Sequence, residues 1–557
     1  MTDIEIPLFK ERKGKRTPGY RFFEMLPGML SIGAIVILIV LSIFTPFWAS
    51  LYVLIIVSFM FIRAAGIAFR TVQGRVMLKR TEKINWAKWL SELEDPGKFF
   101  EIHYKNPHSH KFGLHQHMLN LQHLVEAKNE FPRPSQIYHG VIIALYNESY
   151  DVLGPTLKTI LASDYDPNHL FVVIAYEERG GEAAKATVAS AKKDFEGKFA
   201  DLLTVEHPAN LPDEVIGKGS NITFAGRHFA EYIKKQGIDP DNVIITTLDC
   251  DNQPSPKYFS YLTYEWIITP NRQNVAFQPI ALFTNNIWDA PAPMRVIAAS
   301  NSFWNVISTM RPHMLRNFAS HAQGLTALIG MDFWSTRTIV EDGHQYWRSF
   351  FYFDGNYEVV PIRVGVGQDA VLASTYRKTL KAQFIQLRRW AYGASDIAYV
   401  AHNLCRKDSR IGFFVGWSRF LRLLEAHLTQ ACIAPIVAFG AWVPLYLNSE
   451  AAHRTIIAND LPLVVAQIQM IAIIGLMITV CVSITMLPPR PKRYKKSKGI
   501  MMVLQWVLMP VNAIVYSSAS AYTAQIRLLL GKYIEKFDVT EKAIKGEKIK
   551  KQTNISK

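Results

Sequence analysis

The 557-residue sequence is too long for one compact core, because single hydrophobic cores stop growing at about 250–300 residues, so we expect two or more structural units. Its 49% hydrophobic residues are too many for an ordinary soluble enzyme, whereas its 19% charged residues are too many for membrane helices alone. The formal net charge of +16 is compatible with nucleic-acid binding. However, no basic stripe interleaved with aromatic residues indicates a nucleic-acid module, and we expect no such partner.

Much of the positive charge lies beside strongly apolar segments. Basic residues precede the first such segment and follow the fourth, at Lys10, Arg12, Lys13, Lys15, Arg16, Arg490, Lys492, Arg493, Lys495, Lys496 and Lys498. Short loops rich in Lys and Arg stay on the cytoplasmic side of a membrane. The N-terminus (1–27) and the loop 488–498 are therefore predicted to be cytoplasmic, in a multi-pass protein of a bacterial-type inner or plasma membrane.

Residues 28–69 contain two apolar segments, 28–47 and 50–69. Each is long enough to cross a hydrocarbon core of about 30 Å at about 1.5 Å per helical residue. A cleaved signal peptide is the alternative, but its apolar region would span only about 7–15 residues, and here a second span follows at once. The pattern favours a transmembrane hairpin.

A second membrane region begins after the soluble part of the chain. Residues 411–426 have the pattern of an amphipathic helix in the headgroup plane, with a surface helix over the soluble domain as the alternative. Two spans are predicted within 427–487. The apolar stretch 499–531 contains a proline and an asparagine, and we interpret it as re-entrant or interfacial, because one more crossing would place the basic tail (532–557) outside. Four crossings leave both termini in the cytoplasm.

The region 70–410, which includes a lead-in segment, has no apolar run of transmembrane length. Short β-rich stretches alternate with helical patterns, which predicts an α/β domain. We expect strands at 138–144, 170–175, 243–248 and 274–280. The third of these is continuously apolar or β-branched, as in a strand buried on both faces of a mostly parallel sheet, and such sheets bind ligands at their strand carboxyl ends.

Two carboxylates, Asp249 and Asp251, come directly after that third strand. Mg²⁺ takes oxygen ligands and commonly bridges one or two carboxylates to phosphates, which this spacing suits. Solvated loop acids are the alternative, because a single Asp-x-Asp pair is common in proteins. The metal-binding interpretation of this pair is favoured only by the other motifs that occur along the chain.

Three other segments stand in a suggestive order around this pair: a strand that breaks into a polar turn (141–148), Val340-Glu341-Asp342, and Gln386-Leu387-Arg388-Arg389-Trp390. Together the four resemble the signature of glycosyltransferase family 2, and in particular the membrane-integrated cellulose and hyaluronan synthases, over residues 137–545. The resemblance implies a GT-A-like cytoplasmic domain with a Rossmann-like nucleotide half, and an α-helical transmembrane region beside it.

Two shorter matches extend the resemblance. Lys218 and Asn221 lie in Gly217-Lys218-Gly219-Ser220-Asn221, which is similar to the family's Lys-Ala-Gly-Asn stretch, with a surface turn as the alternative. The tail 537–542 matches the FxVTxK gating loop of cellulose synthases, at Phe537, Val539, Thr540 and Lys542. One position departs from the pattern, since Glu177 and Glu178 replace an expected aspartate. A UDP-sugar is still the favoured donor, but the identity of the nucleotide base is not predicted.

The resemblance also implies roles for the matched residues. Asp342 is the expected general base, with a helix N-cap as the alternative. Asp249 and Asp251 would hold Mg²⁺ or Mn²⁺, and Glu341 and Trp390 would meet the acceptor, Trp390 being alternatively a membrane-interface anchor. The residues expected at the nucleotide sugar are Tyr146, Asn147, Glu148, Glu177, Glu178, Lys218, Asn221, Asp249, Gln386 and Arg389.

The expected function is inverting transfer of a sugar from a nucleotide-sugar donor to a growing polysaccharide, with export of that polysaccharide through the protein's own spans as an additional expectation. The alternative is a non-processive enzyme with a lipid acceptor, as in ceramide glucosyltransferases, which show similar QxxRW segments. A catalytically inactive membrane scaffold is disfavoured, because the motif residues are intact. Expected partners are thus the donor, a polysaccharide or lipid acceptor, and membrane lipid.

Overall fold

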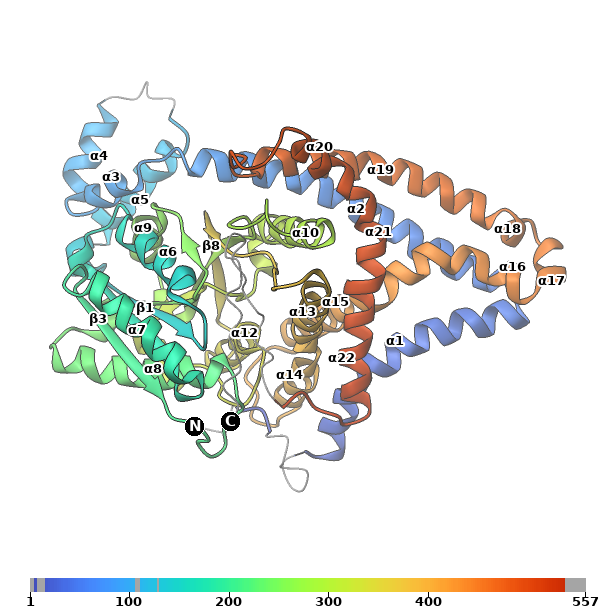
Figure 1. The fold of residues 1–557 in the computed structure, drawn as a ribbon, viewed down its shortest axis with the longest axis horizontal. Coiled ribbons are helices and arrows are strands. Elements are labelled where there is room, and N and C mark those ends of the chain that lie inside the picture. Colours follow the sequence, from blue (N-terminus) through green and yellow to red (C-terminus); the bar gives the residue numbers. More distant parts are fainter. Residues whose placement is uncertain (1–4, 8–15, 106–110, 128–129, 536–557) are drawn as a thin grey trace, which may run out of the picture.

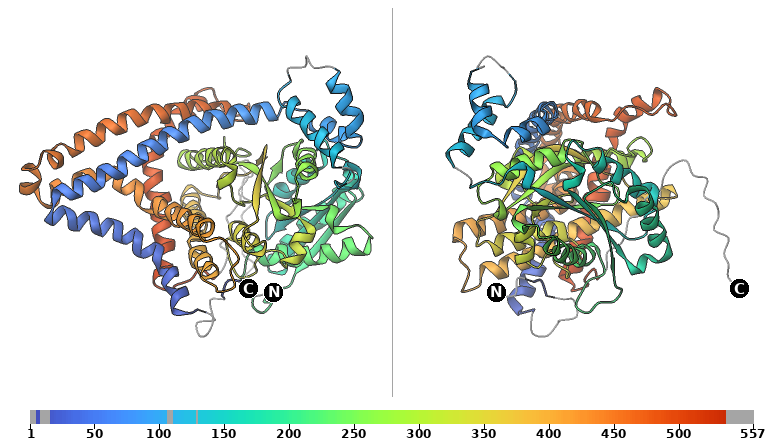
Figure 2. Two further views of the ribbon diagram at one scale, coloured as in Figure 1. Left: turned by 180° about the vertical axis from the view of Figure 1, so that it is seen from behind. Right: turned by 90° about the vertical axis from the view of Figure 1, so that its left-hand side faces the viewer.

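The structure is a computed structural model that describes residues 5–7, 16–105, 111–127 and 130–535. A sheet-containing domain lies at one end, and long helices extend from it to a distant tip (Figures 1 and 2). This is the expected combination of an α/β domain with a helical, strongly apolar region.

One mixed sheet of eight strands organises the domain, in the order β3-β2-β1-β4-β7-β6-β8-β5. Strands β1 to β4 pair in parallel with one another, and β6 pairs in parallel with β8. The short strands β7 and β5 pair antiparallel to their neighbours. The strands are β1 (Tyr138–Leu145), β2 (Leu170–Glu177), β3 (Asp201–His207), β4 (Val243–Asp249), β5 (Gln253–Pro254), β6 (Val275–Leu282), β7 (Ala322–Gly324) and β8 (Glu358–Gly367).

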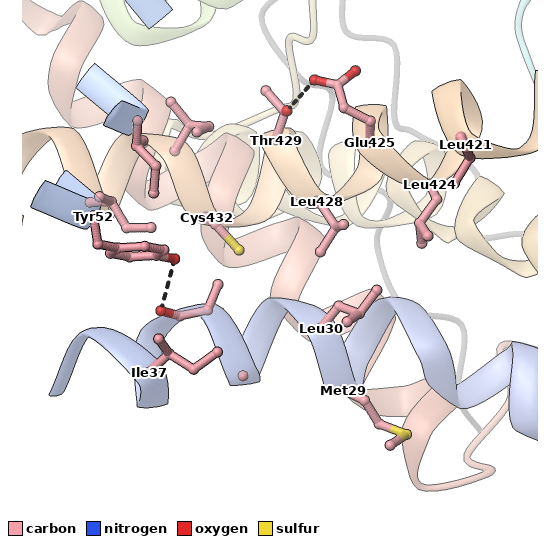
Figure 3. Close-up of a pocket in the computed structure, with 15 residues that line it drawn as sticks. Met29, Leu30, Ile37, Tyr52, Leu421, Leu424, Glu425, Leu428, Thr429 and Cys432 are labelled. Atoms are coloured by element: carbon pink, nitrogen blue, oxygen red, sulfur yellow. Dashed lines mark hydrogen bonds between the residues drawn. The ribbon is translucent and has the colours of Figure 1, made fainter. Parts of the chain in front are cut away.

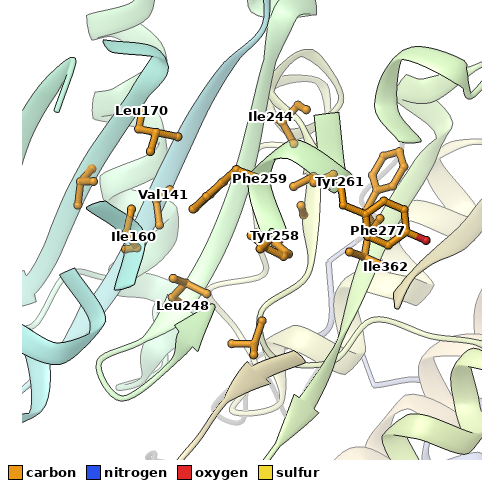
Figure 4. Close-up of a cluster of buried hydrophobic side chains, with 14 of the residues drawn as sticks. Val141, Ile160, Leu170, Ile244, Leu248, Tyr258, Phe259, Tyr261, Phe277 and Ile362 are labelled. Atoms are coloured by element: carbon orange, nitrogen blue, oxygen red, sulfur yellow. The ribbon is translucent and has the colours of Figure 1, made fainter. Parts of the chain in front are cut away.

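The four predicted strands are confirmed as β1, β2, β4 and β6, and two packed cores explain why their sequences are mostly apolar or β-branched. Alternate side chains of a strand point to opposite faces, so Val141 of β1 joins one core and Ile142 the other. The first core is covered by α6 (Tyr150–Leu161), α7 (Gly181–Phe195) and α9 (Tyr258–Ile268) (Figure 4). The second is covered by α8 (Lys218–Lys235) and α11 (Leu325–Gly330).

A further set of helices joins the sheet to the apolar region. They are α10 (Ala292–Thr309), α12 (Glu341–Tyr352), α13 (Tyr376–Ala391) and α14 (Asp396–Leu404). The lead-in segment forms three short helices beside α9, namely α3 (Trp86–Glu92), α4 (Pro96–Tyr104) and α5 (Leu114–Glu126). Trp86 of α3 stacks on Tyr261 of α9 with ring centroids 3.8 Å apart.

Five helical segments are long and apolar enough to cross a membrane: Pro18–Phe44, Pro46–Thr81, Phe413–Leu447, Leu461–Met486 and Ser497–Leu529. The first two are α1 and α2, and they extend the expected hairpin at both ends. The third comprises α15 (Phe413–Phe439) and α16 (Val443–Leu447), and the fourth is α19 (Leu461–Met486). Short helices α17 (Ser449–His453) and α18 (Ile456–Asn459) connect these two at the tip.

The expected break between an interfacial helix at 411–426 and a span from 427 is not present. α15 runs through that boundary as one helix, because the local sequence Glu425-Ala426-His427-Leu428 contains no helix breaker. Its first half carries the exposed aromatic residues Phe413 and Phe414, while Phe420 and Leu424 pack into the core.

The segment Ser497–Leu529 is helical but irregular. It comprises α20 (Ser497–Leu504), a 3-10 turn, α21 (Met509–Asn512), a π-helical stretch over Ala513–Ser518, and α22 (Ala519–Leu529). Figure 1 shows α21 and α22 running crosswise to α2 and α19, along the boundary with the sheet domain. Gln525 is fully buried there and donates to the carbonyl of His427 (3.0 Å). An interfacial position for this segment stays a prediction.

Candidate active site

The carboxyl ends of β1, β2 and β4 meet at one edge of the sheet. Ala144 pairs with Ala175 on one side and with Asp249 on the other, so the turns that follow these strands start side by side. Asn221 of α8 lies across this edge and donates to the carbonyl oxygen of Ala175 (2.8 Å). The sheet thus gathers the predicted turn 146–148, the 177–178 pair and the Asp249 segment.

A buried lysine with three carboxylates around it forms the centre of the candidate site. The Nζ atom of Lys218 lies 3.0 Å from Asp249 Oδ1, 2.9 Å from Asp342 Oδ2 and 3.7 Å from Glu341 Oε1. The side chains of Lys218 and Glu341 are 7% and 4% exposed, whereas those of Asp249 and Asp342 are 37% and 20% exposed. The two aspartates therefore face the solvent side of the cluster, with the lysine and the glutamate behind them.

Close packing of two helix N-termini brings these residues together. Lys218 is the first residue of α8, and Glu341 and Asp342 are the first two of α12. At Gly219, a Cβ atom would lie 2.6 Å from the carbonyl oxygen of Ser335 and 3.1 Å from the Cβ of Glu341, so only glycine allows this approach. Carboxylates in a first helical turn are also favoured by the helix dipole.

The alternative that Asp342 is a helix N-cap is wrong. The capping position of α12 belongs to Val340, which makes no side-chain capping hydrogen bond. Asp342 instead accepts hydrogen bonds from Lys218 through both of its carboxylate oxygens, at 3.2 and 2.9 Å. Its carboxylate is thus held by the cluster rather than by its own helix.

Burial and like charge shift the proton affinities of this cluster. Burial, followed by the charge of Asp342, raises the pKa of Glu341 to about 8 against the opposing effect of Lys218. Burial alone would lower the pKa of Lys218, but the charges of Asp249, Asp342 and Glu341 outweigh it and raise that pKa. Lys218 therefore stays charged, and Glu341 takes up a proton at neutral pH.

This proton uptake predicts a pH dependence of stability. Because the pKa of Glu341 is raised on folding, the folded state binds the extra proton between pH about 4.5 and about 8, and stability falls as pH rises through that window. Glu341→Gln imitates the protonated form, so we expect a flatter stability profile in this variant. Thermal midpoints in detergent from pH 5 to 9 measure the difference, and parallel profiles for the two proteins would contradict the prediction.

His321, which the sequence did not point to, lies behind Asp342. Its Nδ1 is 3.8 Å from Asp342 Oδ1 and donates to the carbonyl of Phe318 (2.8 Å), while its Nε2 accepts from Trp334 Nε1 (3.1 Å). Burial lowers the pKa of His321, which suits this neutral arrangement. The ring is thereby fixed against the back of the cluster.

The second aspartate of the predicted metal pair, Asp251, is buried. Its Oδ2 accepts from the backbone N–H of Asp369 (3.0 Å), and its carbonyl accepts from Asn285 Nδ2 (2.9 Å). Asp369 follows β8, so two separate strands fix the turn that carries the pair. Two carboxylates on a fixed turn are the hard oxygen donors that Mg²⁺ or Mn²⁺ accepts, with phosphate oxygens and water completing the shell.

The other glutamates predicted at the nucleotide are engaged with their own surroundings. Glu148 accepts hydrogen bonds from the backbone N–H groups of Tyr146 (2.9 Å) and Asn147 (3.2 Å), which closes the turn after β1. Glu177 is buried and pairs with Arg179. Glu178 is exposed and accepts from the N–H of Ala209 (2.7 Å). The loop after β3 is thereby tied to the end of β2.

The QxxRW segment forms the C-terminal part of α13, where the sheet domain meets the apolar helices (Figure 1). Arg389 lies close enough to Glu341 to act against its raised pKa. Gln386 accepts from Gln383 Nε2 (3.2 Å). Trp390 is 38% exposed and lies 6.1 Å from the ring of Phe283. This segment thus borders the cluster on the side of the apolar helices.

The remaining predicted residues, Phe537, Val539, Thr540 and Lys542 of the gating loop, lie outside the described residues. The described part of the chain ends at residue 535, shortly after α22. Ile534, close to that end, donates its N–H to the hydroxyl of Tyr392 (3.4 Å), next to the QxxRW segment. The chain therefore enters the tail beside the candidate site.

No protein-family model matches the sequence, and no curated protein matches it either. Among solved structures, the chain is similar to the mannosyltransferase PcManGT from Pyrobaculum calidifontis in complex with GDP-Man and Mn2+ (TM-score 0.39, 14% identity, 86% of this chain and 100% of that chain). It is also similar to S. aureus TarS (TM-score 0.28, 9% identity, 70% and 55%) and to TarS 1-349 in complex with UDP-GlcNAc (TM-score 0.30, 9% identity, 71% and 93%).

Proposed function

We propose that this protein is a membrane-embedded glycosyltransferase that transfers a sugar, with inversion, from a nucleotide-sugar donor to a growing polysaccharide. The observation that carries the proposal is Lys218, which lies between the carboxylate that follows β4 and the carboxylate at the start of α12. It joins the two parts that such a reaction needs, a diphosphate site and a base. UDP is the favoured nucleotide.

In this proposal Asp342 acts as the general base. It takes the proton from the attacking acceptor hydroxyl while the new bond forms at the anomeric carbon and the bond from that carbon to the diphosphate oxygen breaks. Asp342 is partly exposed and fixed from behind by Lys218 and His321, so its carboxylate can meet a substrate without moving far. Lys218 and Arg389 supply positive charge toward the leaving diphosphate.

Asp249 and Asp251 are the residues that would hold Mg²⁺ or Mn²⁺. When bound, such an ion neutralises negative charge on the diphosphate and stabilises its departure. Trp390, half-exposed at the border of the apolar helices, is positioned as an acceptor platform, because the apolar face of a sugar ring suits an aromatic surface. Glu341, protonated at neutral pH, can donate a hydrogen bond nearby.

A lipid acceptor is the second candidate, and one feature favours it. A cavity of about 570 Å³ opens between α1, α2 and α15 and is lined largely by apolar side chains such as Leu30, Ile37 and Leu428 (Figure 3). Its polar edge carries Glu425, which accepts from Thr429 (2.7 Å). Such a cavity among helices suited to a bilayer is shaped for an acyl chain.

Purified protein in liposomes, supplied with a panel of radiolabelled nucleotide sugars and Mn²⁺ or Mg²⁺, tests the proposal. We expect donor-dependent incorporation of label into glycosidase-sensitive product of high molecular weight. Label in the organic phase would identify the lipid acceptor instead. EDTA should abolish incorporation, and Asp251→Ala should weaken metal-dependent donor binding, because it removes one of the two metal carboxylates.

Two controls sharpen this experiment. Asp408→Ala removes an exposed carboxylate that accepts hydrogen bonds from Arg406, two residues earlier in the chain, and should leave incorporation near the wild-type level. Asp342→Asn measures how much label is still incorporated when the proposed general base is absent. Failure of every sugar in the panel, with folded protein, would contradict the proposed function. Equal donor binding with and without EDTA would remove the metal from it.

A further inference from the structure

A second group of ligand-type side chains lies in the lead-in helices, apart from the candidate active site. Glu92 ends α3, His103 lies in α4 and His117 lies in α5. Their ligand atoms all lie within 4.8 Å of one another, and within the described ranges no other set of three or more His, Cys, Asp and Glu side chains meets that criterion. Each of the three helices contributes one residue.

The three side chains converge on one point. The Nε2 atoms of His117 and His103 lie 2.7 and 2.8 Å from the same oxygen, Oε2 of Glu92. The side chains of Glu92 and His117 are 2% and 0% exposed, whereas that of His103 is 17% exposed. The group is therefore closed on the protein side and open to solvent beside His103.

The surroundings of His117 resemble the support that metal-binding histidines receive. Its second nitrogen, Nδ1, is 2.9 Å from the hydroxyl of Tyr264 in α9, which also accepts from Asn120 Nδ2 (3.0 Å). Trp89 stacks on the ring with centroids 4.6 Å apart and planes at 4°. A partner on the far nitrogen fixes the tautomer and ring orientation of a ligating histidine.

A purely structural trio held by hydrogen bonds is the simpler interpretation of these contacts. Two further observations favour a metal. Two imidazoles share one carboxylate oxygen, which leaves the nitrogens of both aimed at a common point. In addition, six of the 16 histidines in the sequence fall between residues 103 and 123, and His-rich tracts are typical of metal binding.

We propose that Glu92, His103 and His117 bind one divalent transition-metal ion of the zinc class, with water in the remaining position on the His103 side. Two imidazole nitrogens and one carboxylate are ligands that suit Zn²⁺, whereas Mg²⁺ and Ca²⁺ prefer oxygen ligands alone. Helices as short as α3 and α4 are marginal by themselves. The ion would lock these helices together and, through Tyr264, onto the sheet domain.

Metal content and affinity test this site directly. The full chain, purified through a tag without histidines, is stripped with EDTA and titrated with Zn²⁺ against a chromophoric chelator, and bound zinc is counted by mass spectrometry. We expect one tightly bound Zn²⁺ per chain, an excess of Mg²⁺ that does not displace it, and an affinity lower by about 100-fold or more in His103→Ala. Zinc should also raise the thermal midpoint of the wild type but not that of His103→Ala.

Three variants make the result specific. His115→Ala removes an exposed histidine of α5 and should keep zinc binding, whereas Glu92→Gln keeps the side-chain shape and should lose it. Asp251→Ala should bind zinc like the wild type, which separates this site from the proposed catalytic metal. Equal losses in His103→Ala and His115→Ala would overturn the proposal in favour of loose binding by the tract. Wild-type zinc content far below one per chain would also overturn it.

Discussion

Asp342→Asn is expected to reduce the turnover of sugar transfer by about 10²–10⁴-fold, the usual contribution of a general base. Asparagine has the same shape, and its amide oxygen can still accept a hydrogen bond from Lys218, which lies 2.9 Å from the native carboxylate. What it lacks is the ability to take a proton. Turnover should therefore collapse while the affinity for the nucleotide sugar changes little, and steady-state kinetics with calorimetric donor binding measure both.

The matched control is Asp354→Asn. Asp354 lies just beyond the end of α12, where it pairs with the exposed Arg410 at 3.4 Å. Asp354→Asn makes the same chemical change at a residue outside the Lys218 cluster, so we expect near-wild-type turnover. If Asp342→Asn turned over at a rate comparable to this control, Asp342 would have no part in the chemistry. If it lost donor binding instead, its role would be in the diphosphate site.

Lys218→Met is expected to have the largest effect on stability. The ammonium group is buried among Asp249, Asp342 and Glu341, and its removal leaves carboxylates without their buried positive partner. Removing one partner of a buried charge pair typically costs about 3–5 kcal/mol. We expect a loss of this size in the free energy of unfolding, followed by tryptophan fluorescence in detergent, and loss of transfer activity with it.

A double-mutant cycle separates lost charge balance from lost packing. The double variant Lys218→Met/Asp342→Asn removes a positive and a negative charge together. We therefore expect it to have a higher free energy of unfolding than Lys218→Met alone. Lys185→Met is the surface control, because Lys185 is about half exposed and lies 3.7 Å from Glu206; it should change stability by less than about 1 kcal/mol. A Lys218→Met protein as stable as this control would show that the cluster is not electrostatically coupled.

The strands that could be predicted from sequence share one property. β1, β2, β4 and β6 are largely buried on both faces, so their sequences are mostly apolar or β-branched. β3 is an edge strand with partly exposed residues, and β8 contains Pro361 and two glycines, so neither shows that pattern. β7 is three residues long and owes its existence to its neighbours. These three strands form because of their pairing with neighbouring strands, and their local sequences contain no pattern that predicts a strand.

The same distinction applies to the candidate site. The sequence pointed to Asp249, Lys218 and Asp342 one by one, through their neighbours in the chain, and the fold brings the three within contact distance. His321 lies in an irregular segment just before β7, and Asp369 in one just after β8, and neither segment carries a recognisable pattern. Their positions follow from long-range packing, so only the three-dimensional arrangement reveals them.

The ring of carboxylates around Lys218 also has a consequence for the order in which substrates arrive. The positive charges of Lys218 and Arg389 do not fully offset the negative charges of Asp249, Asp251 and Asp342, even with Glu341 protonated. A bare diphosphate approaching this edge of the sheet would be repelled. A donor already complexed with a divalent cation would not meet that barrier, so the cation and the nucleotide sugar should enter as a single unit rather than in sequence.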